Sequence, residues 1–84
     1  MQKVILFAVR DGKGETYGTP FVKASRGEAE RTFTQLRRDK STVVAQFPED
    51  FDLFEIGEYE ADTGKVTGYD SPRHMCKAID ISAE

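Results

Sequence analysis

The alternation of apolar and polar positions along the chain predicts four strands. The run Lys3–Val9 is almost continuously apolar and rich in β-branched residues, which is typical of a central strand buried on both faces. The second strand, Glu15–Ala24, alternates loosely, and Pro20 places it at a sheet edge because proline cannot donate to a strand ladder. Phe51–Glu60 alternates as a third strand, and Lys65–Tyr69 returns as a fourth.

One helix is predicted between the second and third strands. Ser25–Glu28 reads S-R-G-E, a capping box in which the serine accepts from the N3 amide and the glutamate reaches back. The helix is therefore expected to run from about Arg26 to about Arg38. Its core-facing stripe, at helical spacing, is Ala29, Phe33 and Leu36. Its opposite face carries Arg31, Gln35 and Arg38.

Turn residues separate these elements. Asp11–Gly14 joins the first two strands, and Asp62–Lys65 forms a hairpin connection with Gly64 at a left-handed position. Thr42–Phe47 fits either helix or strand, and Pro48–Asp50 ends whatever precedes it.

The resulting order is β-β-α-β-β, followed by a short C-terminal helical turn. Ser71-Pro72 has the residues of a helix start, a cap followed by proline at the first helical position. Met75, Ala78 and Ile79 would line that turn. We therefore expect a single α+β domain over residues 1–84, a small antiparallel sheet with the helix packed on one face. With the first strand central, the spatial order 2-1-3-4 makes every neighbour antiparallel, and the helix crosses over to join strands two and three in the favoured right-handed sense.

A chain of 84 residues has a small core, since it buries only roughly 60–65 % of its unfolded surface. Its single cysteine, Cys76, excludes an intramolecular disulfide. We therefore expect a homodimer or higher homo-oligomer, with edge strands available for pairing. The longest apolar run is too short to span a membrane, so no membrane association is expected.

Charge is distributed unevenly. Residues 1–40 hold nine Lys/Arg against five Asp/Glu, whereas residues 41–84 hold three against ten. The pI near 5.1 disfavours a general nucleic-acid binder, although the basic half could still serve one. The alternative is a mixed-sign surface that is merely uneven. Glu55, Glu58, Glu60 and Asp62 are expected to form a solvated acidic face.

Catalytic and cofactor motifs are missing from the sequence. His74 and Cys76 are two residues apart, which would point them away from each other on the predicted helical turn. The glycines of Gly12-Lys13-Gly14 do not complete a phosphate-binding fingerprint, and the loop beginning at Asp50 lacks the glycine that a calcium loop requires. We therefore expect a non-enzymatic protein without cofactor or metal.

What remains is a candidate binding surface of cations interleaved with aromatics, which suits single-stranded nucleic acid because cations contact phosphates and rings stack on bases. The candidate residues are Arg10, Lys13, Tyr17, Phe21, Lys23, Arg31, Arg37 and Arg38. The alternative for Tyr17 and Phe21 is an ordinary place in the core of a small sheet.

Several segments carry a family resemblance. Phe47–Tyr59 reads F-P-E-D-F-D-L-F-E-I-G-E-Y, and the hairpin Asp62–Val66 follows it. Together with Val4–Asp11 and Pro20–Ala29, these segments resemble the small non-structural protein of gokushovirus-type microviruses, which are icosahedral single-stranded DNA phages. The resemblance covers nearly the whole chain.

The resemblance implies a DNA-binding protein that directs replication toward single-stranded genomes for packaging, in the cytoplasm of the infected bacterial host. Single-stranded DNA would be the partner. The alternative function is a protein–protein adaptor that docks on a phage replication or capsid protein through its acidic half.

Overall fold

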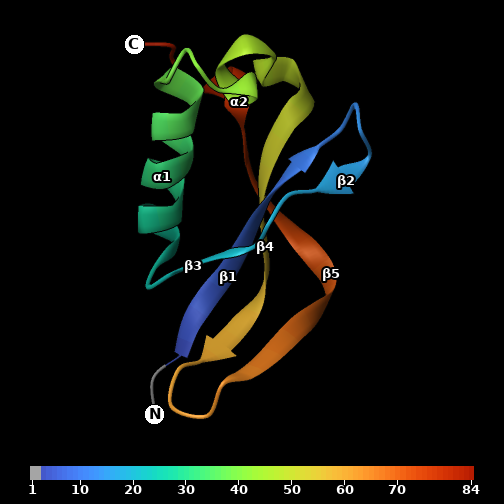
Figure 1. Ribbon diagram of the computed structural model, residues 1–84, viewed down its shortest axis with the longest axis vertical. Coiled ribbons are helices and arrows are strands. Elements are labelled where there is room, and N and C mark those ends of the chain that lie inside the picture. The colour runs from blue at the N-terminus through green and yellow to red at the C-terminus, as the bar shows by residue number, and fades with distance from the viewer. Residues whose placement is uncertain (1–2) are drawn as a thin grey trace.

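The computed structural model describes residues 3–84, which form one antiparallel sheet with a main helix against it (Figure 1). The central strands are β1 (Lys3–Asp11) and β4 (Phe51–Glu60), and β5 (Lys65–Lys77) pairs with the far side of β4. Two short strands, β2 (Thr16–Tyr17) and β3 (Phe21–Lys23), pair with the other side of β1. The predicted α+β class and strand order, with the first strand between the second and third, are confirmed.

The predicted second strand is divided in two. Gly18, Thr19 and Pro20 separate β2 from β3, and the Gly18 amide donates to the Val9 carbonyl at 2.8 Å to hold the chain beside β1. Pro20 has no amide hydrogen to donate, so the ladder between this segment and β1 is interrupted at the proline. The edge position predicted for this segment is confirmed.

The main helix, α1, spans Arg26–Arg38 as predicted. The Ser25 side chain accepts from the Glu28 amide at 3.3 Å, which is the serine half of the capping box. Ala29 and Phe33 are buried, and the helix packs through them on Phe7 and Leu53 of the sheet.

The ambiguous segment after α1 is a short helix, α2 (Val43–Gln46), followed by the 3-10 turn η1 (Pro48–Asp50). Thr42 begins α2 by accepting from the Ala45 amide at 3.1 Å, and its hydroxyl donates to the Leu36 carbonyl of α1 at 2.6 Å. Thr42 therefore fixes the angle at which the chain leaves α1.

The prediction of a helix start at Ser71-Pro72 is wrong, because both residues lie inside β5. Glu55 pairs with Arg73 and Gly57 with Gly68, so four residues of β5, Tyr69–Pro72, lie opposite one residue of β4. β5 bows away from β4 there (Figure 1), and a proline is tolerated in such a bulge because its missing amide removes no ladder bond. The helical turn comes later, as the 3-10 turn η2 (Ala78–Asp80).

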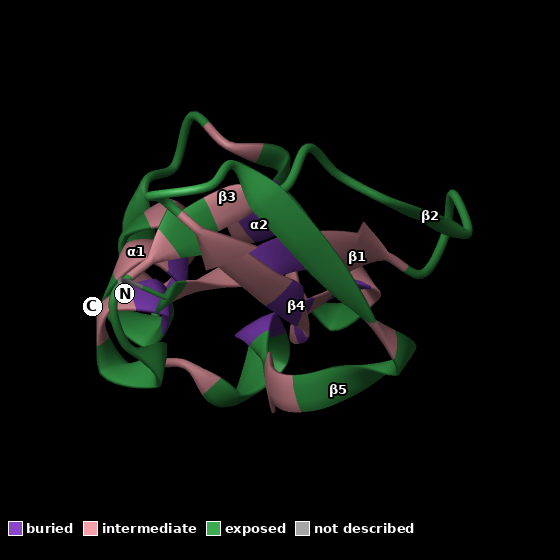
Figure 2. Ribbon diagram, turned by 90° about the horizontal axis from the view of Figure 1, so that it is seen from below, coloured by how far each residue is buried: buried purple, intermediate pink, exposed green. Residues whose placement is uncertain are grey.

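The core lies between α1 and one face of the sheet. Phe51 and Leu53 of β4 are buried there, whereas Asp52 and Phe54, which alternate with them, point to the other face and are partly exposed. We call this other face the open face. The first strand was predicted to be buried on both faces. In β1 only the middle residues, Phe7 and Ala8, are buried, and the other residues are partly or fully exposed. β2 and most of β5 are exposed (Figure 2). No helix within residues 3–84 is long and apolar enough to cross a membrane.

Candidate nucleic-acid interface

A row of four side chains crosses the open face of the sheet, one from each of β2, β1, β4 and β5. Arg10 and Tyr17 are directly paired in the β1–β2 ladder, and the Arg10 guanidinium carbon lies 5.8 Å from the centre of the Tyr17 ring. The Tyr17 ring meets Phe54 edge to face at 5.5 Å, and Phe54 meets His74 in the same way at 5.2 Å. We call Arg10, Tyr17, Phe54 and His74 the cation–aromatic row.

The strand register explains this row. Ala8 is paired with Phe54 and Phe54 with His74, so residues far apart in the sequence come to neighbouring positions on one face. Tyr17 remains 43 % exposed, which leaves much of its ring available to a ligand. The row thus combines a fixed cation with aromatic surface, the two features that single-stranded nucleic acid requires.

Carboxylates lie at one side of the row. His74 Nε2 is 2.7 Å from Asp52 Oδ2, so this aspartate orients the imidazole. A hollow of about 160 Å³ beside Arg10 is bordered by Asp52 and also by Glu49 and Asp50. Phosphate would be repelled from that hollow, so a DNA backbone crossing the row would have to run on the side away from it.

Of the eight residues predicted from the sequence, the structure brings only Arg10 and Tyr17 together in the row. Lys13 lies in the exposed turn between β1 and β2. Phe21 is partly buried on the core side, where its ring stacks on Phe7 at 5.9 Å. Lys23 is paired with Ile5, which packs on the core, so Lys23 emerges on the same side as α1.

The three arginines of α1 among these eight residues belong to a different surface. Arg31 is exposed on the outer side of the helix. Arg37 Nε donates to the Ala78 carbonyl and Arg38 Nε to the Ser82 carbonyl, both at 3.1 Å, so these two arginines hold the C-terminal segment against the helix. Because α1 covers the face opposite the row, the helix cations and the row cannot contact the same short stretch of strand.

Phe54 and His74 were missed from the sequence. The signal for Phe54 is the period-2 alternation of β4, which places Asp52 and Phe54 on one face of the strand and Phe51 and Leu53 on the other. His74 was predicted to lie in a helical turn, whereas it lies in β5 with Met75 as an extra residue between it and Cys76 in the ladder.

Burial raises the pKa of the Cys76 thiol to about 11, so this thiol is protonated at neutral pH.

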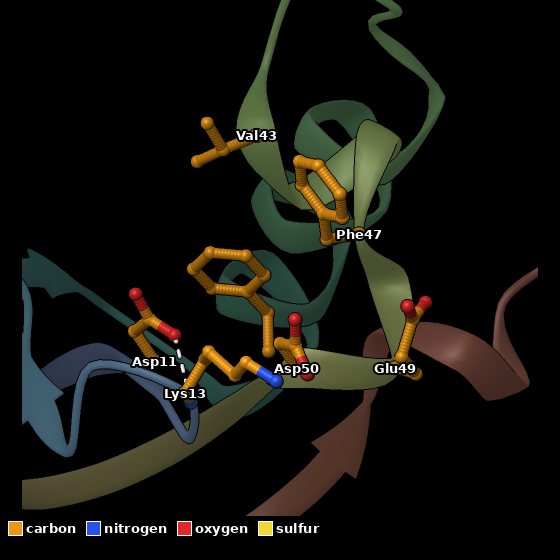
Figure 3. A pocket seen from close by; sticks show the side chains of 7 residues that line it. Asp11, Lys13, Val43, Phe47, Glu49 and Asp50 are labelled. Atoms are coloured by element: carbon orange, nitrogen blue, oxygen red, sulfur yellow. Dashed lines mark hydrogen bonds between the residues drawn. The ribbon is translucent and has the colours of Figure 1, made fainter.

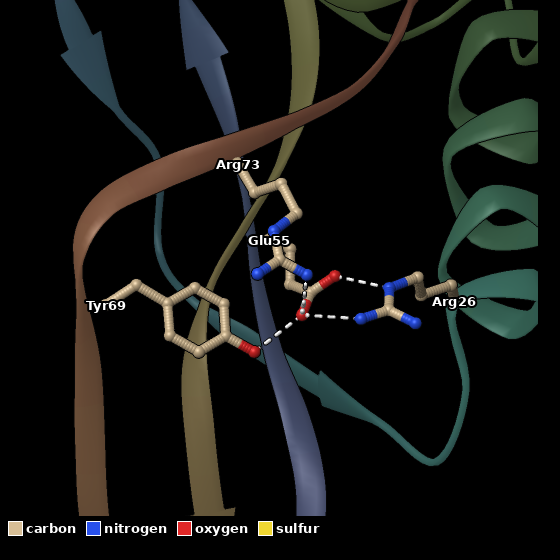
Figure 4. Close-up of polar contacts among 4 residues, drawn as sticks. All are labelled: Arg26, Glu55, Tyr69 and Arg73. Atoms are coloured by element: carbon tan, nitrogen blue, oxygen red, sulfur yellow. Dashed lines mark hydrogen bonds and ion pairs between the residues drawn. The ribbon is translucent and has the colours of Figure 1, made fainter.

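The expectation that Glu55 belongs to a solvated acidic face is wrong. Its side chain is fully buried. Arg26 donates to it from Nε to Oε1 at 2.6 Å and from Nη2 to Oε2 at 3.2 Å (Figure 4). The Tyr69 hydroxyl donates to Oε2 at 2.5 Å, and Arg73 Nη1 lies 3.8 Å from the same oxygen. We call these four residues the Glu55 cluster.

The cluster keeps its carboxylate ionised. Burial by itself raises the pKa of Glu55, but the hydrogen bonds from Arg26 and Tyr69 and the charges of Arg26 and Arg73 outweigh it, so the pKa is lowered from its usual value. The same carboxylate raises the pKa of the Tyr69 hydroxyl. Tyr69 reaches this carboxylate from the bowed segment of β5, whereas Arg73 is paired with Glu55 in the ladder. The cluster therefore has a structural role, in which the guanidinium of Arg26 is already bound to Glu55.

The remaining acidic residues of the hairpin stay at the surface. Glu58 Oε1 lies 3.7 Å from Lys3 Nζ, and the side chains of both residues are about half exposed. Glu60 is partly exposed and Asp62 is exposed. This end of the sheet is therefore unsuited to phosphate.

The family model described as "Phage ORF5 protein" matches residues 4–81, almost the whole chain. Neither the search of curated proteins nor that of solved structures gave a match. The chain therefore belongs to the phage ORF5 protein family.

Proposed function

We propose that this phage protein binds single-stranded DNA through the open face of its sheet and thereby regulates genome replication or packaging in the cytoplasm of the infected host. The observation that carries the proposal is the cation–aromatic row. An exposed Tyr17 ring backed by Arg10 offers a stacking surface and a phosphate contact at neighbouring positions. The resemblance to the microvirus non-structural protein supports the same ligand.

Energetics favour a modest, salt-dependent affinity. Base stacking on an aromatic side chain contributes roughly 1–3 kcal/mol per base, whatever the base. Each phosphate contact adds a counterion-release term that weakens as salt rises. One row of this size accommodates few nucleotides, so an oligomer that joins several rows would bind a long strand much more tightly.

The experiment is a fluorescence anisotropy titration of labelled oligothymidylate at two salt concentrations. Arg10→Glu is expected to weaken binding and to flatten the slope of log affinity against log salt by about 0.7, one phosphate on a single strand. Tyr17→Ala is expected to weaken binding with the slope unchanged, because stacking releases no counterions. Arg31→Glu makes the same charge change on the far side of the molecule and is the matched control.

The outcomes are distinct. If Arg31→Glu flattens the slope and Arg10→Glu leaves it unchanged, DNA binds the helix cations and the open-face proposal is wrong. If neither reversal changes affinity or slope, the basic residues serve only solubility. The second candidate function, the protein–protein adaptor, would then take precedence, since residues 41–84 carry ten Asp/Glu against three Lys/Arg.

A further inference from the structure

A cavity lies at the end of the molecule where the β1–β2 turn meets α2 and η1. Its volume is about 600 Å³, within the range of roughly 300–1,000 Å³ that ligand pockets occupy. Phe51 forms the buried part of its surface, and Val43 and Phe47 line it although they are 56 % and 51 % exposed. Figure 3 shows Phe47 and Val43 beside this space.

Val43 and Phe47 expose apolar surface to water, which is unfavourable unless a partner covers it. Val43 is the first residue of α2, a helix of four residues. Phe47 directly follows the helix and donates its backbone amide to the Val43 carbonyl at 2.8 Å. Val43 and Phe47 are large apolar residues at a cavity, and apolar side chains around a cavity with a few polar groups are typical of a binding site. Their side chains are therefore free to contact a partner.

The pocket is preformed, because its two walls are tied together. The Gly12 amide of the β1–β2 turn donates to the Asp50 carbonyl of η1 at 2.7 Å. Asp11 Oδ1 accepts from the Lys13 and Gly14 amides at 3.0 and 3.1 Å, which fixes the turn itself. Binding of a partner would therefore require little ordering of the pocket, so the entropy lost on this side of the contact is small.

The rim decides which partner fits. Three carboxylates, Asp11, Glu49 and Asp50, surround the apolar surface, against the one cation Lys13 among the residues that line it. This excess of negative charge repels phosphate and favours cations, while the apolar floor favours an inserted hydrophobic side chain.

We propose that this pocket docks a segment of a partner protein in which an aromatic or aliphatic side chain lies between lysines or arginines. The apolar side chain enters between Val43, Phe47 and Phe51, and the flanking cations pair with the rim. The pocket carries this role independently of DNA binding, and its carboxylates leave it no part in contacting DNA phosphates. A second copy of the chain fits less well, because two such rims facing each other would repel.

The test begins with a random dodecapeptide library displayed on phage, selected on the intact protein and counter-selected on the bare support. The most enriched peptide is then synthesised with a fluorescein label and titrated with each variant. We expect enriched peptides to place Phe, Leu or Trp beside Lys or Arg. Phe47→Ser and Glu49→Lys are each expected to weaken binding by about tenfold or more, the loss typical of a residue at the centre of an interface.

Val66→Ser is the matched control, because Val66 is 61 % exposed but lies on the β4–β5 hairpin, and we expect it to bind like the wild type. Thermal melting shows that each variant is folded, and Glu49→Lys tests the rim without touching the apolar surface. The proposal is overturned if no peptide is enriched over the counter-selection, if enriched peptides lack cations, or if binding ignores both pocket variants. It is also overturned if Phe47→Ser dissociates a dimer in sedimentation, which would make the pocket a self-interface. A normal oligonucleotide titration with Phe47→Ser separates this result from the fate of the DNA proposal.

Discussion

Arg26 and Glu55 are joined by two hydrogen bonds, of 2.6 and 3.2 Å, that connect the first turn of α1 to the middle of β4. The carboxylate is fully buried while the arginine side chain remains 56 % exposed, so a surface cation supports a charge inside the core. The fork geometry of the guanidinium satisfies both carboxylate oxygens and fixes the helix over the sheet. Tyr69 and Arg73 of β5 contact the same carboxylate from the other side.

The hydroxyl of Tyr69 is expected to stabilise the fold through its bond to the buried carboxylate. Tyr69→Phe removes one donor from Glu55 and should lower the free energy of unfolding by about 1–2 kcal/mol, measured by urea denaturation. Tyr59→Phe is the control, since no hydrogen bond of the Tyr59 hydroxyl is seen within residues 3–84. Equal stability of the two variants would show that Arg26 and Arg73 satisfy Glu55 without the tyrosine.

The stability contributed by Glu55 is expected to depend on pH. Its pKa is lowered in the folded protein from a usual value near 4.5, so the folded state favours the ionised form. The contribution is fully present above pH 4.5 and is lost as the pH falls through the folded pKa. Glu55→Gln should therefore be less stable than wild type at pH 7, and the gap should narrow in acid. A gap that stays constant from pH 7 to pH 3 would mean that the carboxylate is not the group responsible.

Close backbone approach makes Gly57 intolerant of any side chain. A Cβ atom there would lie 2.4 Å from the Thr67 carbonyl oxygen, whereas one at Gly68, on the facing strand, would meet nothing within 4 Å. Gly57→Ala should cost about 1–3 kcal/mol, the usual price of overpacking, and Gly68→Ala should be nearly neutral. Melting temperatures of the two variants test this, and similar values for both would contradict the described pairing of β4 with β5.

The cap of α1 is expected to contribute measurably. Ser25→Ala removes the oxygen that accepts from the Glu28 amide and should destabilise the protein by about 1 kcal/mol, within a range of about 0.5–2. Ser71→Ala, at an exposed position of β5, serves as the control. If circular dichroism melts give the same midpoint for both, the cap does not limit the stability of the fold.

Asp52 is expected to restrain DNA binding. Asp52→Asn removes a negative charge beside the cation–aromatic row and leaves a neutral amide at the position that contacts His74 at 2.7 Å. Affinity for oligothymidylate should rise about two- to fivefold at low salt, consistent with the removal of one like-charge contact near the surface. Asp62→Asn on the distant hairpin makes the same chemical change and should have no effect. Weaker binding by Asp52→Asn would mean that the aspartate positions His74 for the ligand.

Much of the fold was predictable because its signals are local. Ser25 and Glu28 fixed the start of α1, and Gly64, at φ 77°, closes the β4–β5 hairpin as expected. Ser71-Pro72 led to the wrong prediction because a serine followed by a proline is compatible both with a helix start and with a strand bulge. Here the pair lies in the bulge of β5, next to Tyr69, which is hydrogen-bonded to Glu55.

The site was harder to predict because its residues meet only through the sheet. Arg10 and Tyr17 are close in sequence and were found together. Phe54 and His74 depend on the β4–β5 register and its irregularities. Glu55 appeared to be one more surface carboxylate, since the partner that buries it, Arg26, lies 29 residues away.

The most direct test of the central claim is a nuclear magnetic resonance titration of the ¹⁵N-labelled protein with a short oligothymidylate. The account predicts that the largest shift changes fall on Arg10, Tyr17, Phe54 and His74, with the amides of Arg31 and Gln35 on the outer side of α1 unchanged. Shifts confined to α1, with the row unperturbed at saturation, would contradict it.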